Sequence, residues 1–145
     1  MNNLEELERY FPSDLIREVL GDGVKAIVTR DTIKGGGEAY YSPGLDVIVM
    51  RKNIDLKEAA KRLTDDLGID VSEGEVYPFL LLHELFHFQA RQQGRVATET
   101  ECDTFAKKRL SKMRGWKRRF NIQVSIDIPE IIRRGLREAF RREVP

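Results

Sequence analysis

Two histidines one helical turn apart are the residues of this chain that could do chemistry. The sequence contains two histidines, His83 and His87, in the run His83-Glu84-Leu85-Phe86-His87. On a helix, residues four apart lie on one face, so both imidazoles can approach a single metal ion. Glu84 lies about 100° round the helix, from where its carboxylate can reach a water on that ion. The spacing predicts a metal site with Glu84 as its general base.

Apolar side chains surround this motif on nearly every side of the predicted helix. They are Phe79, Leu80, Leu81, Leu82, Leu85, Phe86 and Phe88. A helix that is apolar all round is a buried helix. Ionisable groups inside it are costly unless they are paired or bound to a metal. The alternative is a pair of hydrogen-bonded core histidines, and the spacing favours a Zn²⁺ site over it.

A third ligand has to come from a carboxylate or from the one cysteine. Catalytic zinc sites usually combine three protein ligands with one open position, and there is no third histidine. The candidates lie in the run Glu99-Thr100-Glu101-Cys102-Asp103. Glu101 points roughly 200° away from Glu99 on a helix, so we expect it to face solvent. Cys102 lies near the right face and stays an alternative ligand, or a small residue that lets two helices approach closely.

An antiparallel return of the next helix selects among these candidates. If the chain turns over residues 94–97, His87 and Glu99 lie at similar distances along the chain from the turn and should face each other. The same holds for His83 and Asp103, each one helical turn further away. Glu99 and Asp103 are also four residues apart, on one helical face. This arrangement favours Glu99 as the third ligand. Asp103 would accept the other ring N–H of a histidine and fix its tautomer.

The two motifs together resemble those of known metallopeptidases. His83-Glu84-x-x-His87 followed by Glu99-x-x-x-Asp103 resembles the gluzincin arrangement of thermolysin. The run over residues 99–106 is similar to the Glu-x-Glu-Ala-Asn/Asp-x-Phe-Ala stretch of compact ImmA/IrrE-type metallopeptidases, with Cys102 in place of the usual alanine. The resemblance covers residues 45–110 and implies a minimal zincin-like fold with Zn²⁺ as its cofactor.

The activity implied is the hydrolysis of peptide bonds in a peptide or protein substrate. Glu84 would take a proton from a zinc-activated water. The developing oxyanion needs a further donor, for which the candidates are Tyr40, Tyr41, Tyr77 and Arg91. Zincin folds, by resemblance, bind the substrate as an extra strand along a sheet edge. We expect the segment Asp46–Arg51 to be that strand.

The elements expected around this site make an α+β fold. Strands are predicted over 24–29, 38–41 and 45–50, and they are expected to form a small antiparallel meander packed on the helices. Helices are predicted over 14–20, 55–68, 78–93 and 98–114. Beyond them, the pattern predicts an extended segment over 120–126 and a last helix over 127–142. The histidine motif is expected to lie on the central buried helix, 78–93.

Length and composition limit the classes of protein. The length of 145 residues predicts a single domain over residues 1–145. The hydrophobic fraction of 41% is typical of a globular protein. A net charge of +1 excludes a uniformly basic nucleic-acid coat and an acidic disordered chain. We find no apolar run of about 18 residues and no signal-peptide pattern at the N-terminus, so no membrane partner is expected. One cysteine and no export signal favour a cytoplasmic protein.

The charges are unevenly distributed along the chain. Residues 1–103 carry 12 basic and 20 acidic side chains, whereas residues 104–145 carry 13 and 4. Eight of the basic residues fall within 107–119, where Trp116 is interleaved. This segment could bind nucleic acid or an acidic protein, or it could be a solvated helix face. It supports an alternative function, a non-catalytic zinc-containing regulatory or nucleic-acid-binding module.

Overall fold

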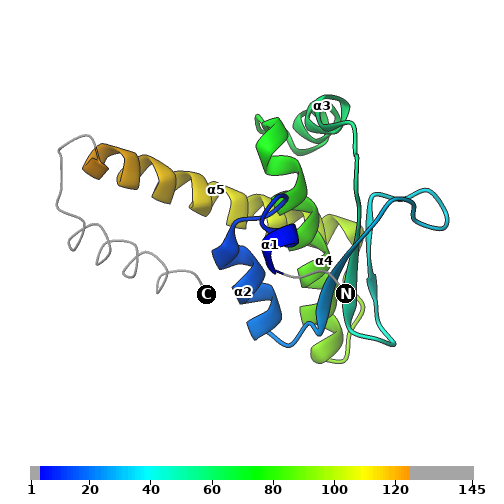
Figure 1. Ribbon diagram of the computed structural model, residues 1–145. Helices are drawn as coiled ribbons and strands as arrows, with labels where there is room; N and C mark the ends of the chain where they lie inside the picture. Colours follow the sequence, from blue (N-terminus) through cyan, green and yellow to red (C-terminus); the bar gives the residue numbers. More distant parts are fainter. Residues whose placement is uncertain (1–3, 125–145) are drawn as a thin grey trace. The chain divides into compact units, whose positions relative to one another are not determined.

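A three-stranded sheet lies beside the helix that carries the histidine motif (Figure 1). The computed structural model describes the backbone of residues 4–124 and the side chains of residues 4–114. It divides into two units, residues 1–108 and residues 109–145, which are described separately. The first unit contains the sheet and the motif, and the single domain expected over 1–145 stays a prediction.

The sheet is mixed, so the antiparallel meander expected from the sequence is wrong. Its strands are β1 (Ala26–Arg30), β2 (Ala39–Ser42) and β3 (Val47–Arg51), in the order β1-β3-β2. β3 runs antiparallel to β2 but parallel to β1. The three central residues of β3 are buried, whereas β1 and β2 alternate or stay half-exposed. The most apolar strand takes the middle position because there both of its edges and both of its faces are covered.

This strand order also corrects the expected substrate strand. The segment Asp46–Arg51 contains β3, which is the central strand and is hydrogen-bonded on both sides. Its backbone groups are therefore already paired within the sheet. β2 is instead a strand at the edge of the sheet that the structure describes.

Five α-helices and one short 3₁₀ helix complete the described chain. They are α1 (Leu4–Leu7), α2 (Ser13–Gly21), α3 (Leu56–Leu67), η1 (Glu73–Glu75), α4 (Val76–Gln92) and α5 (Glu99–Val124). The predicted start of α3 is confirmed, since the Asp55 side chain accepts a hydrogen bond from the backbone N–H of Glu58 at 3.1 Å. Its end at Gly68 is also confirmed, because this glycine has a left-handed φ of 71°.

The motif helix α4 is buried, as its composition predicts. Ten of its 17 residues are buried, and the helix contacts β2, β3 and α3. Leu81, Leu82 and Leu85 have no exposed surface. The histidine motif therefore lies on a helix fixed by packing on several sides, and its side chains start from a rigid backbone.

Helix α5 is longer than the sequence pattern predicts. It continues to Val124, so the predicted end near residue 114 is wrong, and so is the extended segment over 120–124. Lys117, Arg118, Arg119 and Gln123 favour a helix in this stretch, whereas Gly115 alone costs about 1 kcal/mol. The predicted helix over 127–142 lies outside the described residues. Among the described helices, none is both long enough and apolar enough to cross a membrane.

Candidate metal centre

A tight helical hairpin brings the two predicted motifs together. Helix α4 ends in a Schellman motif, in which Gly94 N–H donates to the carbonyl of Arg91 at 2.9 Å and Arg95 N–H donates to the carbonyl of Ala90 at 3.0 Å. Gly94 has a φ of 75°, a conformation that glycine adopts without strain. The chain therefore reverses within a few residues, at the turn expected over 94–97.

The following helix begins with a capping box that sequence reasoning missed. The Thr98 hydroxyl accepts from the Glu101 N–H at 3.1 Å, and the Glu101 carboxylate accepts from the Thr98 N–H at 3.0 Å. Glu101 also binds Arg95 at 3.0 Å, so it points away from the histidines. The Thr-x-x-Glu spacing was a signal for this cap. It fixes Glu99 in the first turn of α5, with its side chain above α4.

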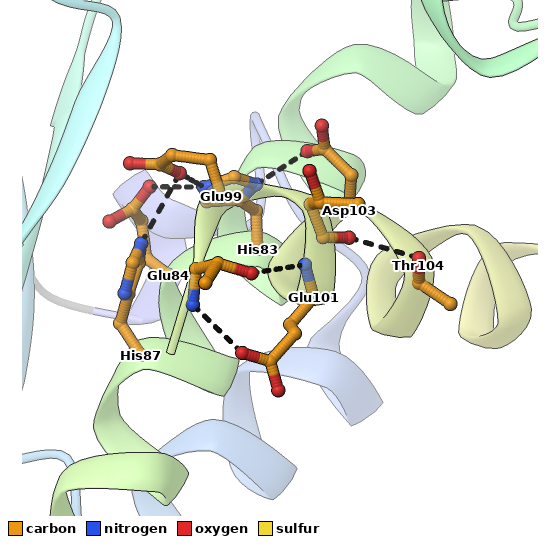
Figure 2. A network of polar contacts seen from close by, with 9 residues as sticks. His83, Glu84, His87, Glu99, Glu101, Asp103 and Thr104 are labelled. Atoms are coloured by element: carbon orange, nitrogen blue, oxygen red, sulfur yellow. Dashed lines mark hydrogen bonds and ion pairs between the residues drawn. The ribbon is translucent and has the colours of Figure 1, made fainter. Parts of the chain in front are cut away.

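Three ligand atoms converge between the two helices (Figure 2). The Nε2 atom of His83 lies 2.5 Å from Oε2 of Glu99, and the Nε2 atom of His87 lies 3.4 Å from the same oxygen. Desolvation raises the pKa of Glu99, but the hydrogen bond from His83 and the charges of both histidines outweigh it and lower the pKa overall. The Glu99 carboxylate is thus held in its anionic, ligand-competent form.

Asp103 lies on the opposite side of the His83 ring. Its Oδ1 atom is 2.7 Å from His83 Nδ1, one helical turn beyond Glu99 on α5. A carboxylate at this position accepts the Nδ1–H and leaves Nε2 directed at Glu99. This is the geometry predicted for Asp103 from the helical hairpin.

Substituting Asp103 with Asn should weaken metal binding about 10- to 100-fold. The amide keeps the shape but removes the charge that orients the imidazole and raises its basicity. The dissociation constant for zinc can be measured by competition with a chromophoric chelator. Asp65→Asn, at an exposed position of α3, is the matched control and should bind zinc like the wild type. Equal affinity in both variants would show that Asp103 does not support the site.

Glu84 is a buried carboxylate beside this cluster. Glu84 is 7% exposed, and its Oε2 atom lies 3.8 Å from Nε2 of His83. Burial raises the pKa of Glu84, while His83 and His87 partly oppose the rise. A buried carboxylate with a raised pKa is a better proton acceptor than an exposed one, as a general base requires.

Cys102 completes a group of four possible metal ligands. One ligand atom each from His83, His87, Glu99 and Cys102 lie within 4.8 Å of one another, close enough to bind a metal ion. The cysteine is fully buried in a small cluster with Ala90, Ala97 and Phe86. Burial raises the pKa of its thiol to about 12, and the nearby carboxylates add to the effect. Without a bound cation, Cys102 is therefore a neutral thiol.

A cleft of about 350 Å³ opens beside Glu84, His87 and Glu99. The edge strand β2 forms one wall, with Ala39, Tyr40, Tyr41 and the following Pro43. The end of α4 and the turn after it form the other, with Arg91, Arg95, Val96 and Ala97. The sequence did not predict this role of β2, because the order of strands in a sheet does not follow from their order along the chain.

The candidate oxyanion donors occupy different environments. The hydroxyl of Tyr77 donates to the Arg51 carbonyl at 3.0 Å and accepts from the Ile54 N–H, so it stabilises the loop after β3. The hydroxyl of Tyr41 donates to Asp46 at 2.5 Å. Tyr40 is 44% exposed in the cleft wall. Two of the four candidates line the cleft without such a hydrogen bond. Within residues 4–114, neither the Tyr40 hydroxyl nor the Arg91 guanidinium is hydrogen-bonded to another residue.

The Tyr41–Asp46 hydrogen bond should make the free energy of unfolding vary with pH in the alkaline range. Burial, followed by the Asp46 hydrogen bond, raises the pKa of Tyr41 to about 12 from 10.0. The folded state thus favours the neutral phenol, a stabilisation that is complete below pH 10 and is lost as the pH rises towards 12. We expect Tyr41→Phe to unfold at lower urea than the wild type at pH 8, and the difference to shrink at pH 11. A difference that does not change with pH would contradict the raised pKa.

The basic segment 107–119 is described in part. The Lys107 ammonium donates to the Leu67 carbonyl at 2.9 Å, and Arg109 is buried. Lys108 and Lys112 are exposed. The side chains of 115–119, including Trp116, lie outside the described residues. A nucleic-acid or acidic-protein partner at this segment stays a prediction.

Comparison with known proteins finds no relative: no protein family, no curated protein and no solved structure matches this chain. The resemblance to gluzincins and to ImmA/IrrE-type metallopeptidases therefore stays a prediction that rests on the residues themselves.

Proposed function

We propose that this protein is a zinc-dependent metallopeptidase. One observation carries the proposal: both histidine Nε2 atoms approach one carboxylate oxygen of Glu99, with the buried Glu84 beside them. Two imidazoles and one carboxylate are a ligand set typical of catalytic zinc. The cleft beside them gives a substrate access to this point.

Each residue has a distinct role in the proposed reaction. Zinc, when bound, would supply an acidified water and a Lewis acid for the scissile carbonyl. His83, His87 and Glu99 would hold it, and Asp103 would orient His83. Glu84 would accept the proton of the attacking water at its carboxylate and pass it to the leaving amine. Tyr40 is the favoured oxyanion donor, since it is in the cleft and its hydroxyl is not held elsewhere within residues 4–114.

The substrate would lie along β2 rather than along β3. β2 is an edge strand and lines the cleft, so an extended peptide could add to the sheet along its outer edge. Such main-chain pairing gives affinity with little dependence on sequence. Cleavage of unfolded proteins is therefore the expected starting activity.

The first test is metal content combined with hydrolysis. Protein purified without added metal should contain about one zinc per chain by elemental analysis, and His83→Ala should contain none. The zinc-loaded protein should cleave an unfolded protein, and cleavage should stop with a chelator and return with zinc. Absence of zinc, together with no uptake of added zinc, would exclude the peptidase.

A second function is favoured by the position of Cys102. Its sulfur is one of the four ligand atoms within 4.8 Å, and four protein ligands would close the coordination sphere, as in structural zinc sites. The protein would then be a non-catalytic module in which zinc stabilises the helical hairpin. Cobalt substitution separates the two functions, because a thiolate ligand adds a charge-transfer band in the near ultraviolet that Cys102→Ala would remove. A spectrum that does not change in Cys102→Ala supports the open catalytic site.

A further inference from the structure

The outer part of the cleft carries exposed apolar surface and two cationic side chains. Val96, in the turn after α4, is 91% exposed, and Tyr40 on the opposite wall is 44% exposed. Arg91 and Arg95 lie on the same side as Val96. Two cations beside exposed apolar surface are a suitable environment for a substrate side chain. Which side chain could bind depends on whether each cation is already paired with an acidic group.

The two arginines differ in whether they are already paired. Arg95 binds the Glu101 carboxylate at 3.0 Å, and its guanidinium lies 5.5 Å from the centre of the Phe86 ring. Within residues 4–114, the guanidinium of Arg91 has neither a hydrogen bond nor an ion pair. The side chain of Arg95 is thus held by the hairpin, whereas the five N–H donors of Arg91 remain available.

Arg91 also has the right position on the helix. It follows His87 by four residues, so both lie on one face of α4. It is close enough to the opposite wall for its charge to act on Tyr41 in β2, where it lowers a phenol pKa that burial raises. The Cα atoms of His87 and Arg91 are therefore separated by roughly 6 Å along the axis of α4.

The charge of the cleft points to an anionic ligand. Glu84 and Glu99 carry the negative charge of the lining, and a divalent ion on the cluster would offset it. Glu101 neutralises Arg95, which leaves the charge of Arg91 without a counterpart in the cleft. A planar guanidinium matches a carboxylate in a bidentate pair.

We infer that Arg91 is a specificity-determining residue that binds a carboxylate of the bound peptide. The inference rests on the proposed peptidase function. Residues in an extended peptide are about 3.3 Å apart, which places this carboxylate within about three residues of the scissile bond. It can belong to an Asp or Glu side chain or to a free C-terminus.

The test uses the full zinc-loaded chain and peptides made around a cut site mapped in an unfolded protein. Glu and Gln are compared at each of three positions on either side of the cut, with a free or an amidated C-terminus. Wild type should favour the carboxylate by about 10- to 100-fold in kcat/KM. The amidated peptides show whether a side chain or the C-terminus is recognised.

Arg91→Gln should remove this ratio, and Arg91→Glu should reverse it in favour of the Gln peptide. Arg95→Gln, a change of the same type in the same cleft, is the control and should retain it. If Arg91 were only an oxyanion donor, its loss would slow both peptides equally and leave the ratio unchanged. An unchanged ratio in Arg91→Gln, or no preference in wild type, would overturn the inference while the peptidase function stands.

Peptide binding separates failure of the inference from failure of the peptidase. The affinity of the same peptides for zinc-loaded Glu84→Gln is measured by fluorescence anisotropy, which needs no turnover. A preference for the Glu peptide that disappears in Glu84→Gln/Arg91→Gln supports carboxylate recognition independently of the cleavage rates. Equal binding of the Glu and Gln peptides would overturn it.

Discussion

Glu84→Gln should reduce peptide hydrolysis by about 10²- to 10⁴-fold and leave zinc bound. The amide fills the space of the carboxylate but cannot accept the proton of the attacking water. The three proposed ligands are unchanged, so zinc content should stay near one per chain. Since Glu84 is 7% exposed and burial raises its pKa, replacing the charge with a neutral group should not destabilise the fold. The measurements are kcat on a peptide substrate, metal content and thermal unfolding.

The same chemical change at Glu99 is the informative contrast. Glu99→Gln removes a proposed ligand rather than the proposed base, so it should lower both activity and zinc affinity. Full activity in Glu84→Gln would exclude Glu84 as the base. Loss of zinc from Glu84→Gln would instead indicate that Glu84 itself ligates the ion.

Zinc should stabilise the folded protein against heat. Zinc at about 100 times its dissociation constant adds about 2.7 kcal/mol to the free energy of unfolding. For a protein of this size that corresponds to a rise in Tm of roughly 10 °C. The physical reason is that the cluster joins α4 to α5, and its ligands come together only in the folded hairpin. Calorimetry with and without zinc measures the shift.

Two controls test whether this stabilisation comes from zinc bound at the proposed site. His83→Ala should unfold at the same temperature with and without zinc, because it lacks one ligand and the partner of Asp103. Magnesium should not stabilise the wild type, since it prefers an all-oxygen site to two imidazoles. An equal zinc effect in wild type and His83→Ala would place the binding site elsewhere in the chain.

The local features of this protein could be predicted from the types and spacing of its residues. The spacing of His83 and His87 defines one helical face, and the apolar residues around them predict the burial of α4 that the structure confirms. The caps of α3 at Asp55 and Gly68 were also readable, because capping depends on residues three to four apart. Glu99 and Asp103 were placed opposite the histidines because a short turn leaves a helical hairpin few possible registers.

The features that depend on distant segments could not be predicted in this way. The sequence predicted three strands, but their order and direction follow from which strand gains most by being covered on both edges. That choice placed β3 in the centre and gave the cleft wall to β2. The pairing of Arg95 with Glu101, which leaves Arg91 available, likewise depends on how the hairpin closes. Local patterns record the preferences of neighbouring residues, whereas these features arise from competition between distant segments for the same contacts.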